Sequence, residues 1–494
     1  MRKVIEKQLK IGQVDICNIS IDLQCRDELP QLLLGLQALY GDKEVRDVIF
    51  AILSEITPED VDANNGRPGM ELWKILVLGT IRLNCKWDFD KVHDIANNHS
   101  KVREFLGHPD YDKQRYGLQT IKDNVSLLTP EVLDRINQVA IQYGHTLVGY
   151  NDPASLHGRC DSFVVETDVH FPTDINLLWD AIRKVIELIS KLCDGIGISE
   201  WRQLQHHLRK IKALFNKANR LKASKSKDEK KIARRAKQIV EAHQAYVDLV
   251  EKYLTRARFT LATITEMGMA DVALSMLIEA FMAHADRQID QIRRRVIKDE
   301  KIPHAEKVFS IFEEHTEWIS KGKAGVSQEL GLKVCILEDQ FGFILHHQVM
   351  QHQTDDQVAV PMVDAAKGKF PGLKGCSFDK GFHSPENQKE LSQRLEHVVL
   401  PRKGKLSAEA KEIEQSEPFV ASRRQHAAVE SAINALENHG LDQCRDHGLH
   451  GFKRYVALAV LSRNIQIIGA LVRQKALKRI KRQQKSESGL LLAA

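Results

Sequence analysis

Apolar side chains in the first third of the chain recur at the spacing of α-helices. Segments such as LLLGLQALY and VRDVIFAILSEI place them on one side of a helix. The segment TPEVLDRINQVAIQYG predicts a further helix, with Thr129 as its N-cap and Pro130 as its first residue. Residues 89–107 predict two short helices, which would form either an ordinary helical hairpin or a helix-turn-helix. We therefore expect residues 1–150 to form an N-terminal helical domain.

The period changes to that of a β-strand at residues 162–174, which read SFVVETDVHFPTD. Apolar and polar side chains alternate there, which places Glu166, Asp168 and His170 on one acidic face. Pro172 is expected to end the strand.

Long helices are predicted again from residue 176 to about residue 304. One mostly apolar seam has steps of four and three residues, as in a helical hairpin or a coiled coil. Its members are Ile232, Ala236, Ile239, His243, Tyr246 and Val250. Because β-rich segments precede and follow these helices, we expect them to be an insertion within an α/β unit.

Strands and helices alternate after this insertion. Residues 331–350 predict two strands joined by a turn at residues 339–342. A helix opened by Asp355 and Asp356 (QVAVPMVDAAKG), a strand (LKGCSFD), a helix capped by Ser384 and a strand (HVVLP) follow in that order. A long helix, FVASRRQHAAVESAINALENHG, is expected to end at Gly440.

This order of elements matches an RNase H-like core in a mixed α/β fold. The core then comprises residues 161–175 and 305–470, with the helical insertion at residues 176–304 after its first strand. The N-terminal helical domain precedes it, and a basic tail covers residues 471–494.

Three acidic residues fall where such a core would use them. Asp168 lies on the first strand, Asp379 at the end of a later strand and Glu430 inside the closing helix. A carboxylate at a buried strand end is unfavourable unless something offsets its charge, and a metal ion can do so. Two Mg²⁺ ions about 4 Å apart need oxygen ligands from separate elements, so we expect the three carboxylates to converge within ~8 Å. Taken singly, each acid is more often a surface residue.

The chain resembles the DDE transposases of bacterial insertion sequences, in particular the group labelled ISNCY. The similar segments are residues 166–181, 310–334, 377–387, 398–406 and 423–448. The resemblance implies that Asp168, Asp379 and Glu430 are the catalytic triad and bind two Mg²⁺ ions, for which Mn²⁺ can substitute. It also implies a homodimer on double-stranded DNA, which binds the terminal inverted repeats of the element and the target DNA, with residues 1–150 as a DNA-binding region.

Basic residues near these acids are candidates for DNA contacts. Lys380 follows Asp379 directly, and Gly381 is expected to allow a sharp bend there. Lys321 and Lys323 belong to the segment KGKAG.

The helix around Glu430 departs from the pattern of the family. Arg423, His426 and Glu430 share one helix face at spacing i, i+3, i+7. Relatives carry Tyr, Arg and Lys around the glutamate, whereas this chain has Arg423, His426 and Glu437 at those positions. The roles of Arg423 and His426 in DNA binding are therefore an open expectation.

The net charge of +6 is unevenly distributed. Residues 209–237 carry 13 Lys and Arg against two acids, or +11, and the tail from residue 471 carries +6, which leaves −11 for the remainder. Two basic segments on an acidic body suggest a polyanion partner, although a solvated helical face is the alternative. We expect DNA contacts at Lys230, Lys231, Arg234 and Arg235.

Other classes of site have weak support. The eight cysteines form no CxxC or Cys/His spacing, which argues against a zinc site or a disulfide framework. GKFPGLKG lacks the spacing of a P-loop, so no nucleotide cofactor is expected. The apolar run at residues 72–83 is too short to span a membrane, and no signal peptide precedes it. We expect a cytoplasmic, nucleoid-associated bacterial protein without membrane contact.

The sequence therefore predicts a DNA transposase that cleaves and joins the ends of an insertion sequence by two-metal phosphoryl transfer. An RNase H-like structure-specific nuclease would keep the same acids without joining DNA. A DNA-binding protein that has lost catalysis is a third alternative, which the intact acids disfavour.

Overall fold

The computed structural model describes residues 3–6, 8–57, 69–150, 155–269, 271–320, 328–404 and 406–491. The chain forms two compact units. The core unit comprises Met1–Asp168 and Glu317–Ala494, and the insertion unit comprises Val169–Thr316. The chain thus leaves the core unit directly after Asp168, earlier than the boundary expected at residue 175.

Helices form the N-terminal part of the core unit, as predicted. The cap of α7 is the predicted one, because the side chain of Thr129 accepts a hydrogen bond from the Val132 amide and Pro130 begins the helix. The two short helices predicted over residues 89–107 are α4 and α5. The elements are α1 (Glu28–Gly41), α2 (Lys43–Ser54), α3 (Leu72–Asn84), α4 (Phe89–Asn98), α5 (Ser100–Phe105), α6 (Leu118–Val125) and α7 (Pro130–Val148).

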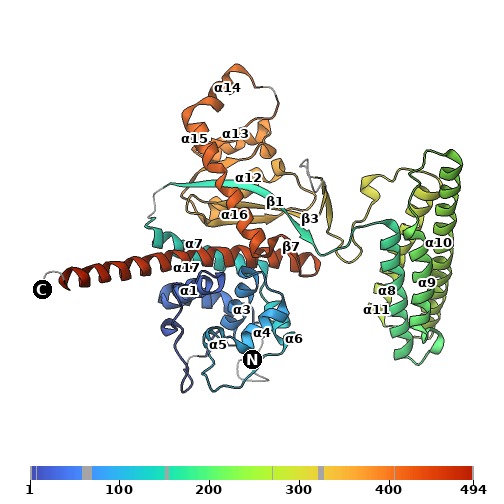
Figure 1. The fold of residues 1–494 in the computed structure, drawn as a ribbon, viewed down its shortest axis with the longest axis horizontal. Helices are drawn as coiled ribbons and strands as arrows, with labels where there is room; N and C mark the ends of the chain where they lie inside the picture. The colour runs from blue at the N-terminus through green and yellow to red at the C-terminus, as the bar shows by residue number, and fades with distance from the viewer. Residues whose placement is uncertain are drawn as a thin grey trace. The chain divides into compact units, whose positions relative to one another are not determined.

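The C-terminal helix α17 (Gly448–Leu491) packs against α1, α3, α7 and strand β4, so it joins the N-terminal helices to the sheet (Figure 1). At its crossing with α1 the backbones nearly touch, since a Cβ at Gly469 would lie 1.8 Å from the Gln31 carbonyl oxygen. The segment Gly448–Gln484 is long and apolar enough to cross a membrane, but 72% of its most apolar window is buried inside the protein. Burial of that kind is typical of the core helix of a soluble protein.

Seven strands of the described chain form one open mixed sheet. Its order is β2-β3-β1-β5-β6, with β4 also paired to β3 and β7 to β1. β1 pairs antiparallel with β3 and parallel with β5, β3 pairs antiparallel with β4, and β5 pairs parallel with β6. The strands are β1 (Leu156–Thr167), β2 (Glu317–Ser320), β3 (Gln328–Glu338), β4 (Ile344–Val349), β5 (Leu373–Phe378), β6 (His397–Val399) and β7 (Gln443–Cys444).

The first strand differs from the prediction. β1 begins at Leu156 and ends at Thr167, so Asp168 lies just beyond it. Its register with β3 is continuous from Arg159 to Glu166, which makes the segment before residue 162 a central strand. That half of β1 alternates His157, Arg159 and Asp161 with smaller residues, and this polar face hid the strand from the apolar pattern.

Helices cover both faces of the sheet. α12 (Asp355–Lys369) packs on β3, β4 and β5 and contacts α13 (Pro385–Arg394), which Ser384 caps as predicted. α15 (Glu417–His426) packs on β5 and β6, α16 (Ala428–Leu436) packs on β1, and α14 (Ala408–Gln415) packs on α15.

The long closing helix predicted over residues 419–440 is interrupted. α15 ends at His426 and α16 begins at Ala428, and a π-helical turn at Glu437–Leu441 follows. Gly440 does end this region, with a left-handed φ of 107°. The break lies between Arg423 and Glu430, which were expected to share one continuous helix face.

The insertion unit is helical throughout the part that the structure describes in regular elements. Its core includes the fully buried Trp201 and Tyr246, and the predicted seam on α10 is buried at His243, Tyr246 and Val250. Ile232, near the start of α10, is 42% exposed, so the seam does not extend to that end. The helices are α8 (Asp174–Gly195), α9 (Leu204–Arg220), α10 (Glu229–Glu266) and α11 (Val272–Ile292).

Candidate active site

Two aspartates lie side by side on neighbouring parallel strands. Cys160 of β1 pairs with Phe378 of β5, and the next residue along each chain is Asp161 or Asp379. Residues of equal register on parallel strands point to the same face of a sheet. Asp379 follows the last residue of β5, where the chain turns into the short 3-10 helix Lys380–Phe382. The two carboxylates therefore share one face of the sheet at the end of β5.

Glu430 joins them from the helix that covers this face. It lies in the first turn of α16, whose residues Val429 and Leu436 are buried while Glu430 is exposed. Burial, together with the weaker effect of the negative charges of Asp379, Asp355 and Glu430, raises the pKa of Asp161 to about 6, against the lowering effect of a hydrogen bond from the Ser162 amide. These electrostatic effects show that the acids lie close enough together to repel one another.

Asp355 belongs to the opposite face of the sheet. At the start of α12, its carboxylate accepts a hydrogen bond of 2.7 Å from the Ser162 hydroxyl and forms an ion pair of 3.0 Å with Lys333. Ser162 follows Asp161 on β1, so its side chain points away from the Asp161 face. Asp355 is thus compensated by a cation and a hydroxyl donor, whereas Asp161 accepts a hydrogen bond of 2.7 Å from the Ser162 amide and feels the negative charges of other carboxylates.

Gly381 serves a different purpose from the predicted one. It lies in the turn Lys380–Phe382 without a left-handed φ, so the bend does not require glycine. A Cβ at this position would come 3.1 Å from Asp355 Oδ2, which is a tight contact. The glycine therefore permits the close approach of the turn to α12.

His426 lies next to the acids but is half-buried. Its Nδ1 is 3.0 Å from the hydroxyl of Ser377 on β5. Burial lowers the pKa of His426, while the charges of Asp379 and Glu430 act in the opposite direction. It is therefore packed into the floor of the site, and its expected role in DNA binding stays a prediction.

Arg159 brings a half-buried positive charge to the same floor. It forms an ion pair of 2.9 Å with Glu338 of β3, and its Nη2 donates to the Asp339 carbonyl at 2.6 Å. Burial raises the pKa of Glu338 to about 7, against the lowering effect of Arg159.

The expected convergence is not found for Asp168. Its carboxylate is exposed beyond β1 and accepts a hydrogen bond of 3.1 Å from Gln443 Nε2. Asp168 is seven residues beyond Asp161, which at ~3.3 Å per residue is about 23 Å along the strand. The charges of Asp379 and Glu430 both act on Asp161 and on His426, so Asp161 is the acid that we consider in place of Asp168, and the convergence of Asp379 with Glu430 stays a prediction. The alternation of His157, Arg159 and Asp161 was the available signal for this residue.

The predicted basic residues are distributed over both units. Lys380 and Arg423 are exposed in the core unit, and Lys321 and Lys323 lie outside the described residues. Lys403, which the predictions did not single out, donates from Nζ to the Gly381 carbonyl at 2.8 Å and so lies beside the Asp379 turn.

The four basic residues of the insertion unit all lie in the first turns of α10. Lys230, Lys231 and Arg234 are exposed, and Arg235 is half-buried. Lys231 is 3.9 Å from Asp228, and Arg235 donates from Nε to the Lys222 carbonyl at 2.9 Å. Arg235 thereby ties the start of α10 to the connection that precedes it.

The acid cluster fits a divalent cation by charge and donor type. Within the described ranges, no three His, Cys, Asp or Glu side chains are already arranged around a common metal position. The chemistry of the donors nevertheless suits Mg²⁺, because Asp161, Asp379 and Glu430 offer only carboxylate oxygens. A cation among them would offset the burial and the weaker repulsion that together raise the pKa of Asp161. The eight cysteines are free thiols, as predicted.

Comparison of the chain with protein-family models, with curated proteins and with solved structures gives no match in any of the three. The function of the site therefore has to be argued from its geometry and from the sequence.

Proposed function

We propose that the protein is a DNA transposase that cleaves and joins DNA strands by metal-dependent phosphoryl transfer, with Asp161, Asp379 and Glu430 as its catalytic acids. The observation that carries the proposal is the register of β1 and β5, which sets Asp161 beside Asp379. The charge of Glu430 acts on the same Asp161 carboxylate. Carboxylates that converge from two strands and a helix are the ligands that a two-metal site requires. This assignment replaces Asp168 by Asp161 as the first acid.

An RNase H-like core is the fold that we assign to the sheet of the core unit. Support comes from the order β4-β3-β1-β5-β6, in which the first three strands are antiparallel and the last two run parallel to β1. The connection after β5 is helical, as is the one before it. Since one fold hosts many activities, this likeness supports the function only together with the acids.

The chemistry follows from charge placed around a phosphodiester. When bound, two Mg²⁺ or Mn²⁺ ions would supply an activated oxygen nucleophile and stabilise the leaving oxygen. Asp161, Asp379 and Glu430 would hold these ions, and α16, which carries Glu430, packs on β1. Lys380 and Lys403 flank the Asp379 turn and would attract the phosphate backbone.

We assign DNA binding to exposed Lys and Arg side chains of both units. Lys230, Lys231 and Arg234 lie on the surface of the insertion unit, and Lys478 and Arg479 lie on the surface of α17. Such residues bind the phosphates of double-stranded DNA without reading its sequence. We propose that the partners are the terminal inverted repeats and a target duplex, bound by a homodimer.

The test uses duplexes that carry the DNA sequences flanking the gene. With Mg²⁺, the full-length protein is expected to nick these ends and join them to a plasmid, and Asp161→Asn should abolish both steps. Asp168→Asn is the matched control, because it removes an exposed carboxylate seven residues away on the same chain segment. Cleavage without joining would identify a nuclease, and binding without cleavage would identify a protein that has lost catalysis.

A further inference from the structure

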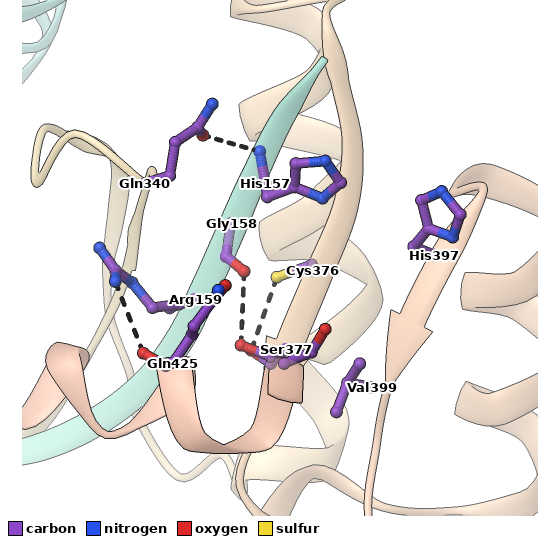
Figure 2. A pocket seen from close by; sticks show the side chains of 10 residues that line it. His157, Gly158, Arg159, Gln340, Cys376, Ser377, His397, Val399 and Gln425 are labelled. Carbon is purple, nitrogen blue, oxygen red and sulfur yellow. Dashed lines mark hydrogen bonds between the residues drawn. The ribbon is translucent and has the colours of Figure 1, made fainter. Parts of the chain in front are cut away.

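A pocket lies beside the acid cluster on the same face of the sheet. It has a volume of about 410 Å³, counting the part open to solvent, and it is formed by β1, β5, β6 and α15 (Figure 2). The lining residues that matter here are His157, Arg159, Ser377, His397 and Gln425.

The pocket and the acids share one floor. Arg159 lies two residues before Asp161 on β1, and Ser377 lies two residues before Asp379, so all four side chains point to the same face. Two residues along a strand span ~6.6 Å. The pocket therefore begins within the length of about one nucleotide from the two aspartates.

Its lining is opposite in character to the acid cluster. None of the described residues that line the pocket is acidic, and Arg159 contributes a cation to its wall. The imidazoles of His157 and His397 stack with ring centroids 5.9 Å apart and an interplanar angle of 28°. Burial lowers the pKa of His157, which favours the neutral ring. A lining of this kind suits a flat, uncharged or electron-rich group and disfavours a cation.

The other polar side chains of the pocket can form hydrogen bonds with the edge of a flat group bound there. Figure 2 shows the two imidazoles at one end of the pocket and Ser377 and Gln425 at the other. The backbone carbonyl of Gln425 is within 3.5 Å of Arg159 Nη1, and its side chain is exposed. The Ser377 hydroxyl already contacts His426 and the Gly158 carbonyl. Gln425 is thus the residue best placed to contact an incoming group.

We infer that this pocket receives the base of the nucleotide next to the scissile phosphate, turned out of the duplex. The inference rests on the proposed function, since the acids fix where the phosphate lies. Enzymes that do chemistry on a DNA base recognise the extruded base by stacking and by hydrogen bonds to its edge, and proteins that bind single strands stack bases on flat side chains. The stacked imidazoles would supply the first contact and Gln425 the second.

The experiment places 2-aminopurine at the nucleotide next to the cleaved bond, after the bond has been mapped with the wild-type protein. With Ca²⁺ in place of Mg²⁺ to keep the strands intact, binding of the full-length protein should raise the fluorescence at least about threefold, because the base leaves the stack. The same probe five base pairs away should change little. The double variant His157→Ala/His397→Ala should show less than half of the wild-type increase.

Two further variants distinguish a role of the imidazoles in base recognition from a general loss of structure. His397→Phe keeps a flat ring and should retain the fluorescence increase, whereas His450→Ala removes an exposed histidine of α17 and should behave as wild type. An abasic site at the probed position should restore cleavage by the double variant. Cleavage with no fluorescence change in the wild-type complex would overturn this inference alone, whereas absence of cleavage on any DNA would overturn the proposed function.

Discussion

The two units of this protein carry opposite charge in opposite surroundings. In the core unit, Asp161 is partly buried among other carboxylates on one face of a sheet, and its pKa is raised to about 6 by burial and by their repulsion. In the insertion unit, Lys230, Lys231 and Arg234 are exposed on the first turns of a long helix. The positions of the aspartates relative to each other are set by a strand register, whereas the Lys and Arg side chains need only an exposed helical surface.

This difference indicates what each unit can do. Phosphoryl transfer requires charges fixed to within a fraction of an ångström around one phosphorus atom, and strands with a set register provide that. Attraction to a DNA backbone requires only positive charge near the phosphates. Mutations should therefore have sharp, position-dependent effects in the core unit and graded, additive effects in the insertion unit.

The largest effect is expected from the aspartates themselves. Asp161→Asn and Asp379→Asn should each lower the rate of DNA strand cleavage at least about 1,000-fold, or about 4 kcal/mol at 1.36 kcal/mol per factor of ten. The amide keeps the shape of the side chain and removes the charge that binds a cation. Single-turnover cleavage in Mg²⁺ measures the rate, and a DNA-binding assay should show affinity close to wild type.

Asp168→Asn tests whether activity distinguishes Asp161, on β1, from Asp168, which lies just beyond the end of this strand. Because Asp168 is exposed and contacts Gln443, its variant should stay within about threefold of the wild-type rate, as expected for a surface substitution. If Asp168→Asn were inactive and Asp161→Asn active, the assignment of the acids from the strand register would be wrong.

Features that depend on neighbouring residues can be predicted from the sequence, whereas the role of Asp161 cannot. Local signals were sufficient for the Thr129 cap, the Ser384 cap and the turn after β3, because each depends on residues next to one another. Asp161 was missed because Arg159, two residues earlier, looks unsuited to a central strand.

The partner that makes Arg159 tolerable is distant in sequence. Glu338 pairs with it across β1 and β3, 338 − 159 = 179 positions later. No periodicity near residue 159 reports that contact. The break at Ala427 between α15 and α16 was missed for a similar reason, since no Gly or Pro marks it and packing on different strands sets it.

The insertion unit should respond in a graded way. Replacing Lys230, Lys231, Arg234 and Arg235 by Gln should reduce the slope of log affinity against log salt by up to ~3.6, because each lost phosphate contact removes about 0.9. The measurement is DNA affinity between 50 and 200 mM salt, with cleavage at saturating protein unchanged as a check on the core unit.

A matched control for this variant is available on the same unit. Lys252→Gln and Arg287→Gln remove two exposed charges from other parts of the insertion helices and should leave the slope within about 0.3 of wild type. An equal loss of slope in the control would mean that only the total charge of the unit matters. An unchanged slope in the fourfold variant would mean that these Lys and Arg side chains form a solvated helical face and do not contact DNA.

A smaller effect is expected when Mg²⁺ is added to the protein without DNA. A cation that binds only the folded state stabilises it by about 2.7 kcal/mol at 100 times its Kd. Calorimetry should show this stabilisation for wild type, for Asp168→Asn and for the fourfold Gln variant. It should be mostly lost in Asp161→Asn, because the two remaining carboxylates attract a shared cation less strongly than three carboxylates do. Equal stabilisation of all four proteins would place the cation elsewhere.

The smallest effect is the dependence of stability on pH in the absence of metal. The pKa of Asp161 rises from 3.8 to about 6 on folding, so the folded protein holds this proton more tightly than the unfolded chain does. Its contribution to stability is therefore present below pH 4 and is lost as the pH rises through about 6. The shift of about two pKa units corresponds to about 3 kcal/mol at 1.36 kcal/mol per unit, which partial exposure of the carboxylate reduces to about 1–2 kcal/mol.

Asp161→Asn isolates the contribution of the Asp161 carboxyl group to the pH dependence of the unfolding free energy, because the amide does not titrate. Between pH 4 and pH 7 the unfolding free energy of the wild type should fall relative to that of Asp161→Asn by about 1–2 kcal/mol, and the variant should be the more stable protein at pH 7. Urea unfolding at each pH, with EDTA present, measures the difference, and Asp168→Asn should run parallel to wild type. A variant less stable than wild type at pH 7 would mean that Asp161 is compensated by a partner, and the repulsion that favours a cation at this site would not exist.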